Sequence, residues 1–291
     1  MRLDDEQISN NVEDRRSEDF RSGFGGFAGM GRLLALWPLL RPLLRTKTGW
    51  VLIVLGLLFY FTDPLGIFHH TPPGRVAQNE KSEALFIKKV LKTTEEVWGR
   101  LLPKYGLRYS DPTLVLYRGY TSSGCGTASN QVGPFYCPVD QKIYLDLNFF
   151  EILRNRHHAQ GDFAQAYVLA HEVGHHVQDI LGILQKIHKL QQRALVQGDR
   201  TLANHLQIPV ELQADCFAGV WAHYVRDRLD RGDIEEAINT ASKIGDDTLQ
   251  KEAQGYVVPD SFTHGTSRQR VTWFLKGYKS GDLRSCNTFE R

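Results

Sequence analysis

Residues 167–179 read YVLAHEVGHHVQD, and this stretch decides how the rest of the chain is interpreted. It predicts a helix in which three histidines and a glutamate are bracketed by Val, Leu and Ala. Histidine is a mediocre helix former, and apolar neighbours indicate partial burial, so the imidazole nitrogens need partners. His171 and His175 are four residues apart, which places both rings on one helix face, one turn apart. Two such imidazoles can bind one Zn²⁺ ion and supply half of a tetrahedral site.

Glu172 directly follows the first of these histidines. Because it is adjacent to His171 in sequence, its carboxylate does not lie on the same helix face as the two histidines. It can still reach a water molecule at the metal, as a general base must. The neighbouring His176 points away from the ligand face, and we predict that it packs or supports a ligand. The alternative for the whole group is a set of structural histidines bonded to backbone carbonyls.

A catalytic zinc site needs a third protein ligand and an open fourth position. The candidate ligand is Glu211 in the segment ELQAD, on the next strongly apolar predicted helix. Asp215 lies four residues later on the same face, where it can accept the N–H of a ligating histidine and hold the ring. An E-x-x-x-D pair usually lies on a solvated helix face. The residues around this pair are apolar, however, and a carboxylate buried among them needs a metal or a hydrogen-bond partner.

The strongest apolar run of the chain lies far upstream, at residues 49–62, GWVLIVLGLLFYFT. Extended to 48–68, it approaches the roughly 20 residues that cross a bilayer core, and it predicts one transmembrane helix. A buried core helix is the alternative, but the run has no polar face. A cleaved signal peptide is disfavoured because a long charged segment precedes the run.

The charges around this run predict its orientation, because positive residues stay on the cytoplasmic side. No acidic residue occurs from 20 to 62, and only Arg75 follows the run closely. The basic residues before the run are Arg21, Arg32, Arg41, Arg45 and Lys47. We therefore expect a single-pass protein of the cell inner membrane with its N-terminus in the cytoplasm. The expected parts are a basic, Gly-rich cytoplasmic tail (1–47), the transmembrane helix (48–68), a linker (69–80) and an extracytoplasmic domain (81–291).

All four cysteines, Cys125, Cys137, Cys216 and Cys286, follow the apolar run. An even number of cysteines in an extracytoplasmic domain predicts disulfides. The sequence permits three pairings, and we favour Cys125–Cys137, across the loop CGTASNQVGPFYC, together with Cys216–Cys286. A cysteine metal site is disfavoured because no CxxC spacing occurs.

The sequence of the outer domain predicts an α+β fold that is rich in helices and has a small sheet near its start. The segments TLVLYRGY and KIYLDLNFF predict strands, and the apolar spacing from Lys81 predicts a helix. Further helices are expected from Asp162, from near Pro209 and from Asp233, where Glu236 completes a capping-box pattern. The net charge of +2 gives no reason to expect a nucleic-acid partner.

Together, HEVGHHVQ and ELQADCFAGVW resemble the bacterial family described as putative neutral zinc metallopeptidases. The similarity extends to NVEDRR near the start and to GYVVPDSFTHGTSRQRVTWF and SGDLRSCNTF near the end, so it spans nearly the whole chain. It implies a membrane-anchored hydrolase with one span and an outer zincin-like metallopeptidase domain. It also implies His171 and His175 as zinc ligands and Glu172 as the catalytic glutamate. The family's further acidic motif corresponds to Glu211 and Asp215, and by analogy with zincins whose third ligand is a glutamate, Glu211 is the metal ligand.

His264, in FTHGTSRQR, is predicted to lie on a loop. A loop imidazole near zinc can donate a hydrogen bond to the oxyanion of a tetrahedral intermediate; the alternative is a buried histidine that organises the C-terminal turn. Tyr256 is a weaker candidate for the same donation. We expect Arg268 and Arg270 to be structural ion-pair partners.

These residues predict metal-assisted peptide hydrolysis. Zinc held by His171, His175 and Glu211 lowers the pKa of its bound water toward neutrality. Glu172 takes the proton during attack and passes it to the leaving amine. The expected substrate is a peptide or protein of the cell envelope, which can add as a strand along KIYLDL. Two other functions stay open: a zinc hydrolase of a non-peptide cell-envelope amide, and a membrane-anchored binding or assembly protein with structural zinc.

Overall fold

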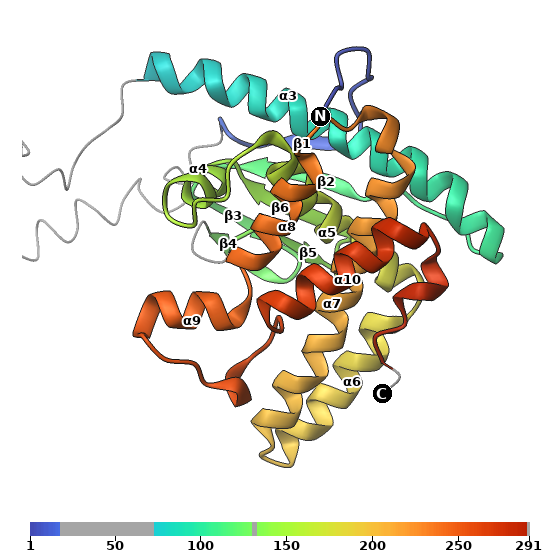
Figure 1. Cartoon of the computed structure of the whole chain (residues 1–291), viewed down its shortest axis with the longest axis vertical. Coiled ribbons are helices and arrows are strands. Elements are labelled where there is room, and N and C mark those ends of the chain that lie inside the picture. The colour runs from blue at the N-terminus through green and yellow to red at the C-terminus, as the bar shows by residue number, and fades with distance from the viewer. Residues whose placement is uncertain (18–72, 130–132, 290–291) are drawn as a thin grey trace, which may run out of the picture. The chain divides into compact units, whose positions relative to one another are not determined.

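The computed structural model describes residues 1–17, 73–129 and 133–289 (Figure 1). The predicted α+β class is confirmed, because a small sheet lies among helices that make up most of the described chain. Four strands form a sheet in the order β1-β2-β6-β5, and β3 pairs with β4 in a separate hairpin. The strands are β1 (Val12–Asp14), β2 (Thr113–Tyr117), β3 (Tyr120–Ser123), β4 (Gly126–Ser129), β5 (Phe135–Cys137) and β6 (Lys142–Asp146). The α-helices are α3 (Pro73–Leu101), α4 (Asn148–Asn155), α5 (Asp162–Ile180), α6 (Ile183–Val196), α7 (Arg200–Tyr224), α8 (Asp233–Lys243), α9 (Asp246–Gln254) and α10 (Ser267–Ser280).

The strands β2 and β6 form the centre of the sheet and are almost entirely buried. Their near-continuous apolar sequences, TLVLY and KIYLD, are typical of strands that are covered on both faces. β6 pairs with β2 in parallel and with β5 in antiparallel orientation. Because β6 is hydrogen-bonded on both sides, the predicted addition of a substrate along KIYLDL is wrong. The edge strand next to β6 is β5, and its outer side is where an extended peptide could pair.

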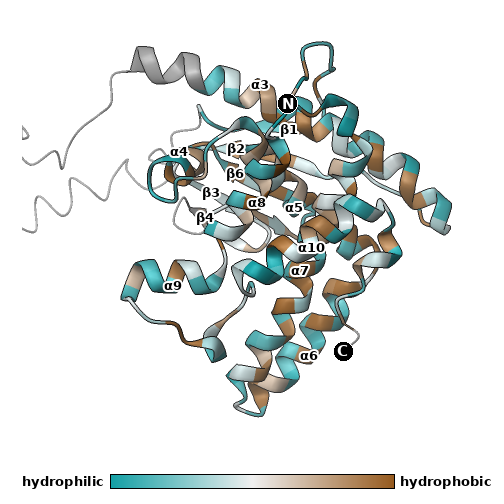
Figure 2. Cartoon of the chain, in the orientation of Figure 1, coloured by the Kyte–Doolittle hydropathy of each residue, from teal (hydrophilic) through white to brown (hydrophobic). Residues whose placement is uncertain are grey.

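The helices α5 and α7 face each other in the core, and both are buried along most of their length. Figure 2 shows apolar residues along both helices, whereas α9 is largely hydrophilic. A β-carbon at Gly174 would lie 3.0 Å from the backbone of Ala214, so a glycine at this position lets the two helices approach closely. The glycine of HEVGH thus brings the two halves of the predicted metal motif together.

Two predicted helix starts are wrong. The helix α3 begins at Pro73, so residues 73–80 of the predicted linker are helical. Proline suits the first turn of a helix, where its missing N–H would have no partner. The helix α7 begins at Arg200, capped by the Asp199 side chain, which accepts the Leu202 N–H at 2.8 Å. Pro209 therefore lies inside α7, where packing of the apolar helix outweighs one missing hydrogen bond.

The predicted capping box at the start of α8 does not form. The N-cap of this helix is Gly232, and no side chain caps it. The Glu236 carboxylate instead accepts the backbone N–H of Phe163, at the start of α5, at 3.0 Å. Glu236 therefore ties two helices together, because an orphan N–H of a neighbouring helix competes for the same oxygen.

Residues 1–17, which the sequence assigns to a tail, are folded against the rest of the described chain. These residues belong to one compact unit with residues 82–291. The strand β1 pairs in parallel with β2, and Leu3 is buried in the core. Residues 1–17 are therefore part of this folded unit; the predicted side of the membrane stays a prediction. The apolar run at 48–68 itself lies outside the described residues.

Within the described residues, no helix has both the length and the apolar character needed to span a membrane. The structure contains both disulfides that we favoured from the sequence, Cys125–Cys137 and Cys216–Cys286. The first ties β5 to the residue that precedes β4, and the second ties the C-terminal segment to α7. All four cysteines of the chain are therefore paired.

Candidate metal centre

His171, His175 and Glu211 converge in the core, although Glu211 comes from a different helix. Glu211 Oε2 lies 3.2 Å from Nε2 of His171 and 3.5 Å from Nε2 of His175. Ligands at zinc distances of about 2.0–2.2 Å stand about 3.3 Å apart when they surround the ion tetrahedrally. Both distances from the carboxylate thus suit a zinc site, all three ligand atoms lie within 4.8 Å of one another, and two imidazoles with one carboxylate are a donor set that zinc accepts.

Each histidine is oriented by a hydrogen bond from its other ring nitrogen. His171 Nδ1–H donates to Asp215 Oδ1 at 2.8 Å, and His175 Nδ1–H donates to Gln178 Oε1 at 2.9 Å. These bonds select the tautomer in which Nε2 carries the free lone pair and point both Nε2 atoms at the same place. The role predicted for Asp215 as a histidine acceptor agrees with this geometry.

Two glutamines at the site were missed by the sequence analysis. Gln207 Nε2 donates to Glu211 Oε1 at 2.7 Å, which leaves Oε2 facing the histidines. Gln178 in turn donates from Nε2 to the backbone oxygen of Val210 at 2.7 Å. Helical spacing was the available signal, because Gln207 lies four residues before Glu211, and Gln178 lies three residues after His175.

Asp215 is fully buried and is held by charge. Arg270 donates to both of its oxygens, from Nε at 2.8 Å and from Nη2 at 2.9 Å, and the Tyr167 hydroxyl donates at 2.5 Å. Burial would raise the pKa of Asp215, but Arg270 and His171 outweigh burial and lower this pKa to about 2. Asp215 is therefore an anion that can orient His171, and the ion-pair role predicted for Arg270 is confirmed.

A pocket of about 410 Å³ opens beside these residues. His171, His175, Glu211 and Glu172 line one part of it, and apolar side chains line another part. The apolar lining includes Phe149, Leu153, Val168, Ile244 and Leu249. The Glu172 carboxylate accepts no hydrogen bond from any described residue, so it is available to take a proton from a molecule in the pocket.

His264 also lines the pocket, on the loop between α9 and α10. Its Nδ1 lies 3.1 Å from Asp246 Oδ1, and its side chain is about half exposed. Asp246 Oδ2 additionally accepts the backbone N–H groups of Thr263, His264 and Gly265. Asp246, which the sequence analysis missed, thus holds the loop so that His264 reaches the pocket. Its position at the first residue of a helix was the only signal.

The other two polar candidates lie elsewhere. Tyr256 is 62% exposed and does not line the pocket, so the structure gives no support to a donor role for it. His176 is buried; its Nε2–H donates to the Ser110 carbonyl at 2.6 Å, and its Nδ1 is hydrogen-bonded to the Tyr136 hydroxyl. His176 therefore packs α5 against the sheet region, as predicted, and does not face the candidate metal centre.

A second group of acidic residues in the described chain, Asp162, Asp233 and Glu236, has suitable spacing for a metal. The α-ammonium group of Met1 lies 3.0 Å from Asp162 and 3.2 Å from Asp233. This cation already balances the acidic group, so the donor set with two imidazoles is the better candidate.

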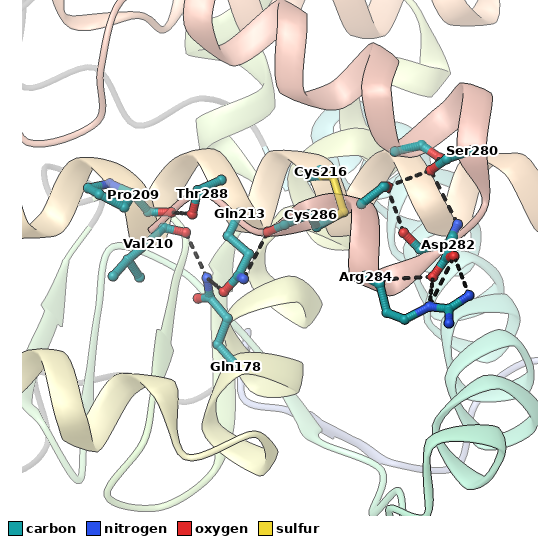
Figure 3. Close-up of a disulfide and its surroundings, with 12 residues drawn as sticks. Gln178, Pro209, Val210, Gln213, Cys216, Ser280, Asp282, Arg284, Cys286 and Thr288 are labelled. Atoms are coloured by element: carbon teal, nitrogen blue, oxygen red, sulfur yellow. Dashed lines mark hydrogen bonds and ion pairs between the residues drawn. A yellow bond between two sulfur atoms is a disulfide. The ribbon is translucent and has the colours of Figure 1, made fainter. Parts of the chain in front are cut away.

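Side-chain amides lie between the Cys216–Cys286 disulfide and α5 (Figure 3). The Cys286 carbonyl accepts Nε2–H of Gln213 at 2.9 Å, and Gln213 Oε1 accepts Nε2–H of Gln178 at 3.0 Å. Gln178 is the acceptor for His175. A continuous row of hydrogen bonds therefore runs from the disulfide-linked C-terminal segment to one candidate metal ligand, and Figure 3 shows its part from Cys286 to Gln178.

Comparisons with known proteins place the chain in a family named for zinc. The profile of the family described as "Putative neutral zinc metallopeptidase" matches residues 1–289. "Uncharacterized protein YpfJ" of Escherichia coli strain K12 is 45% identical over 299 residues, which cover 99% of each chain. "Uncharacterized protein Rv2575" of Mycobacterium tuberculosis strain H37Rv is 41% identical over 210 residues, 68% of this chain and 67% of the relative. No solved structure matches the chain.

Proposed function

The chain belongs to the family of putative neutral zinc metallopeptidases, and from that premise we propose that it hydrolyses peptide bonds at the His171–His175–Glu211 site. One observation carries the proposal: three candidate ligand atoms converge in a pocket that also contains Glu172, whose carboxylate has no hydrogen-bond partner among the described residues. We also propose a zincin-like arrangement, in which one helix supplies two histidines and a second helix supplies the third ligand.

His171, His175 and Glu211 would hold the zinc beside the pocket, from which water can approach. The bound zinc would supply Lewis acidity and lower the pKa of water toward neutrality. Glu172 accepts the proton of the attacking water and delivers it to the leaving amine. His264 donates a hydrogen bond to the carbonyl oxygen as negative charge develops on it. Asp215 and Gln178 keep the two histidine rings oriented throughout.

The substrate is an extended peptide or protein segment of the cell envelope that pairs with the outer edge of β5. Phe135 and Tyr136 of this strand line the pocket, and within the described chain β5 pairs only with β6. An edge strand offers unpaired N–H and C=O groups that can bind an extended peptide. The apolar part of the pocket, including Leu153 and Val168, then receives a substrate side chain beside the bond that is cleaved.

The test is Glu172→Gln in the full-length chain loaded with zinc. We expect peptide hydrolysis to fall by about 10²–10⁴-fold, because a general base is lost, while the zinc content stays at that of the unmodified protein. The matched control is Glu235→Gln, which changes an exposed glutamate on α8 and leaves hydrolysis unchanged. Unchanged hydrolysis in Glu172→Gln would remove the catalytic role of this residue.

The same pair of proteins separates the proposal from its rivals. The unmodified chain and Glu172→Gln are incubated in parallel with a mixed peptide library and with isolated cell-envelope material. Cleavage of peptides that depends on Glu172 supports a peptidase. Glu172-dependent release of non-peptide amide products alone indicates the other hydrolase, and zinc retention without any Glu172-dependent product indicates a structural site.

A further inference from the structure

The helices α6 and α7 form a hairpin whose turn lies at the opposite end of the folded unit from the sheet (Figure 1). The two helices pack side by side through buried residues such as Ile187 and Ala203. Every residue from Leu195 to Leu202 is exposed, however. We call residues 195–202 the hairpin tip, and no other described segment covers it.

The hairpin tip carries large apolar side chains. Val196 is 87% exposed, the largest fraction of any large apolar residue in the described chain. Leu195 and Leu202 are 46% and 45% exposed, and Leu190, further back on α6, is 36% exposed. Exposed apolar residues are ordinary when they are scattered singly, whereas a group of them indicates an interaction site.

A second exposed apolar segment lies close to the hairpin. Tyr256 is 62% exposed, and Val257 and Val258 are each 39% exposed, in the loop that follows α9 (Figure 2). This loop is attached to α7 near the tip, because Asn204 Nδ2 donates to the Asp260 carbonyl at 3.3 Å. Of the thirteen large apolar side chains that are exposed in the described chain, seven therefore belong to the hairpin or to this loop.

Basic residues stand behind the apolar tip. The exposed basic residues of the hairpin are Lys186, Lys189, Arg193 and Arg200. None of the four forms an ion pair with another described residue. Residues 183–208 and 256–261 contain two acidic residues, Asp199 and Asp260, which leaves an excess of two positive charges. The surface therefore favours an anionic partner.

The order of these residues along the hairpin matches the layers of a lipid surface. Arg193 lies about 4–5 Å behind Val196 along the helix axis, and Lys189 lies about 10 Å behind it. The headgroup region of one leaflet is about 5–8 Å thick. An apolar tip at the edge of the acyl chains thus places Arg193 and Arg200 among the phosphates, with the lysines just outside.

We propose that the hairpin tip binds the surface of a bilayer that contains anionic lipids. Its apolar side chains enter the boundary between headgroups and acyl chains, Arg193 and Arg200 bind phosphates, and Tyr256 lies at the interface. The tip projects from the end of a hairpin, and a fluid lipid surface receives such a projection without a preformed groove. Because α7 also carries Glu211, eleven residues after Arg200, the candidate metal centre stands about 16 Å from the tip along this helix.

Fluorescence quenching in the full-length chain tests this contact. Because all four native cysteines are in disulfides, one introduced cysteine is the sole free thiol. A thiol-reactive fluorophore is attached to Gln197→Cys, at the tip, and to Gln160→Cys, an exposed control that precedes α5. Each chain is mixed with vesicles that have brominated acyl chains, either of phosphatidylcholine alone or of equal parts phosphatidylcholine and phosphatidylglycerol.

We expect the vesicles with phosphatidylglycerol to quench the label at residue 197 and not the label at residue 160. High salt should weaken this quenching because it screens surface charges. In the Gln197→Cys chain, Arg200→Gln should lower the ratio of quenched to unquenched label about 5-fold, the effect of one charge at an anionic surface. The matched control is Arg231→Gln, an exposed arginine before α8, which should leave this ratio unchanged.

Three results would overturn the proposal. Without quenching at residue 197, there is no lipid contact; photo-cross-linking from this position to a protein in cells would then identify a protein partner instead. Equal quenching at residues 160 and 197 would show that the tip is not the contact. Equal quenching by both kinds of vesicle, unaffected by Arg200→Gln, would remove the role of anionic lipid. The label reports only on its own surroundings and needs no peptidase activity, so this proposal and the proposed function fail separately.

Discussion

The candidate metal centre and the N-terminal strand are both assembled from segments that are far apart in the chain, but they are held in different ways. At the metal centre, α5 and α7 bring together polar side chains that only a cation or a hydrogen-bond partner can satisfy. At the sheet edge, β1 is held mainly by backbone pairing with β2 and by ion pairs such as Glu13–Lys142. The first arrangement depends on a few residue types, and the second depends on fold topology.

This difference predicts how each region responds to mutation. Loss of one polar group at the metal centre leaves other buried polar groups without a partner, which is costly. A change in the N-terminal strand removes packing or one hydrogen bond, which costs less and does not affect the metal directly. The following changes test this distinction, from the largest expected effect to the smallest.

The largest effect is expected for Glu211→Gln. This change removes the charge of the carboxylate that faces both histidine Nε2 atoms, so we expect zinc affinity to fall by more than the about 10–100-fold typical of a supporting residue. Hydrolysis should be lost with the metal. Zinc content by mass spectrometry of the native protein measures the effect. A full complement of zinc in Glu211→Gln would show that another residue completes the site.

The next effect is expected for Arg270→Met, which leaves the buried Asp215 carboxylate without its main cation. Breaking a buried ion pair in this way costs about 3–5 kcal/mol of unfolding free energy. Zinc affinity should also fall by about 10–100-fold, because Asp215 no longer holds His171 in one orientation. Denaturant unfolding and zinc titration measure the two effects.

The matched control for that change is Arg268→Met, two residues earlier on α10 and exposed. It should alter neither unfolding nor zinc affinity by a measurable amount. If Arg268→Met and Arg270→Met behave alike, the charge on Asp215 does not matter to the metal centre.

A smaller effect is expected in the N-terminal segment. Leu3 is 6% exposed, and Leu3→Ala should lower the unfolding free energy by about 2 kcal/mol, the lower end for a buried leucine, without changing zinc affinity. Ile8 is 48% exposed, so Ile8→Ala should stay within about 0.5 kcal/mol of the unmodified protein. Equal, negligible effects of both changes would mean that residues 1–17 are not docked in solution.

The smallest effect concerns pH. A hydrogen bond from Arg16 holds the pKa of Asp14 at about 2 against some burial, with further help from Lys88. A carboxylate with a lowered pKa stabilises the fold above its ordinary value near 3.8, and this stabilisation is lost as pH falls from about 4 toward 2. The protection factors of residues 11–16, which are exchange rates corrected for the intrinsic pH dependence of amide exchange, should therefore be steady from pH 8 to 5 and fall below pH 4. In Asp14→Asn this fall in protection below pH 4 should be smaller.

The comparison also shows how much of the molecule could be predicted from sequence. His171, His175 and Glu211 were predictable because few structures other than a metal centre need these residue types at this helical spacing among apolar neighbours. The cysteine pairs and the α+β class followed from composition and local pattern. Arg270 could be assigned an ion pair, but its partner Asp215 is 55 residues away, a relation that local spacing does not contain.

Other features could not be predicted because they depend on contacts between distant segments. The pairing of Val12 with Leu114 joins residues about a hundred positions apart, and a three-residue strand has no distinctive pattern. The start of α7 at Arg200 was missed because Pro209 is normally a sign of a helix boundary. Glu236 was assigned to its own helix because local capping patterns do not reveal that Phe163 lies nearby.

The amide row that joins Cys286 to His175 has a consequence for the order of maturation. Before Cys216 and Cys286 form their disulfide, no cross-link holds the C-terminal segment against α7. The Cys286 carbonyl is then not fixed beside Gln213, and the His175 imidazole is less well aligned. We expect a newly made, reduced chain to acquire zinc poorly and an oxidised chain to acquire it well. Formation of the Cys216–Cys286 bond would then precede loading of the candidate metal centre.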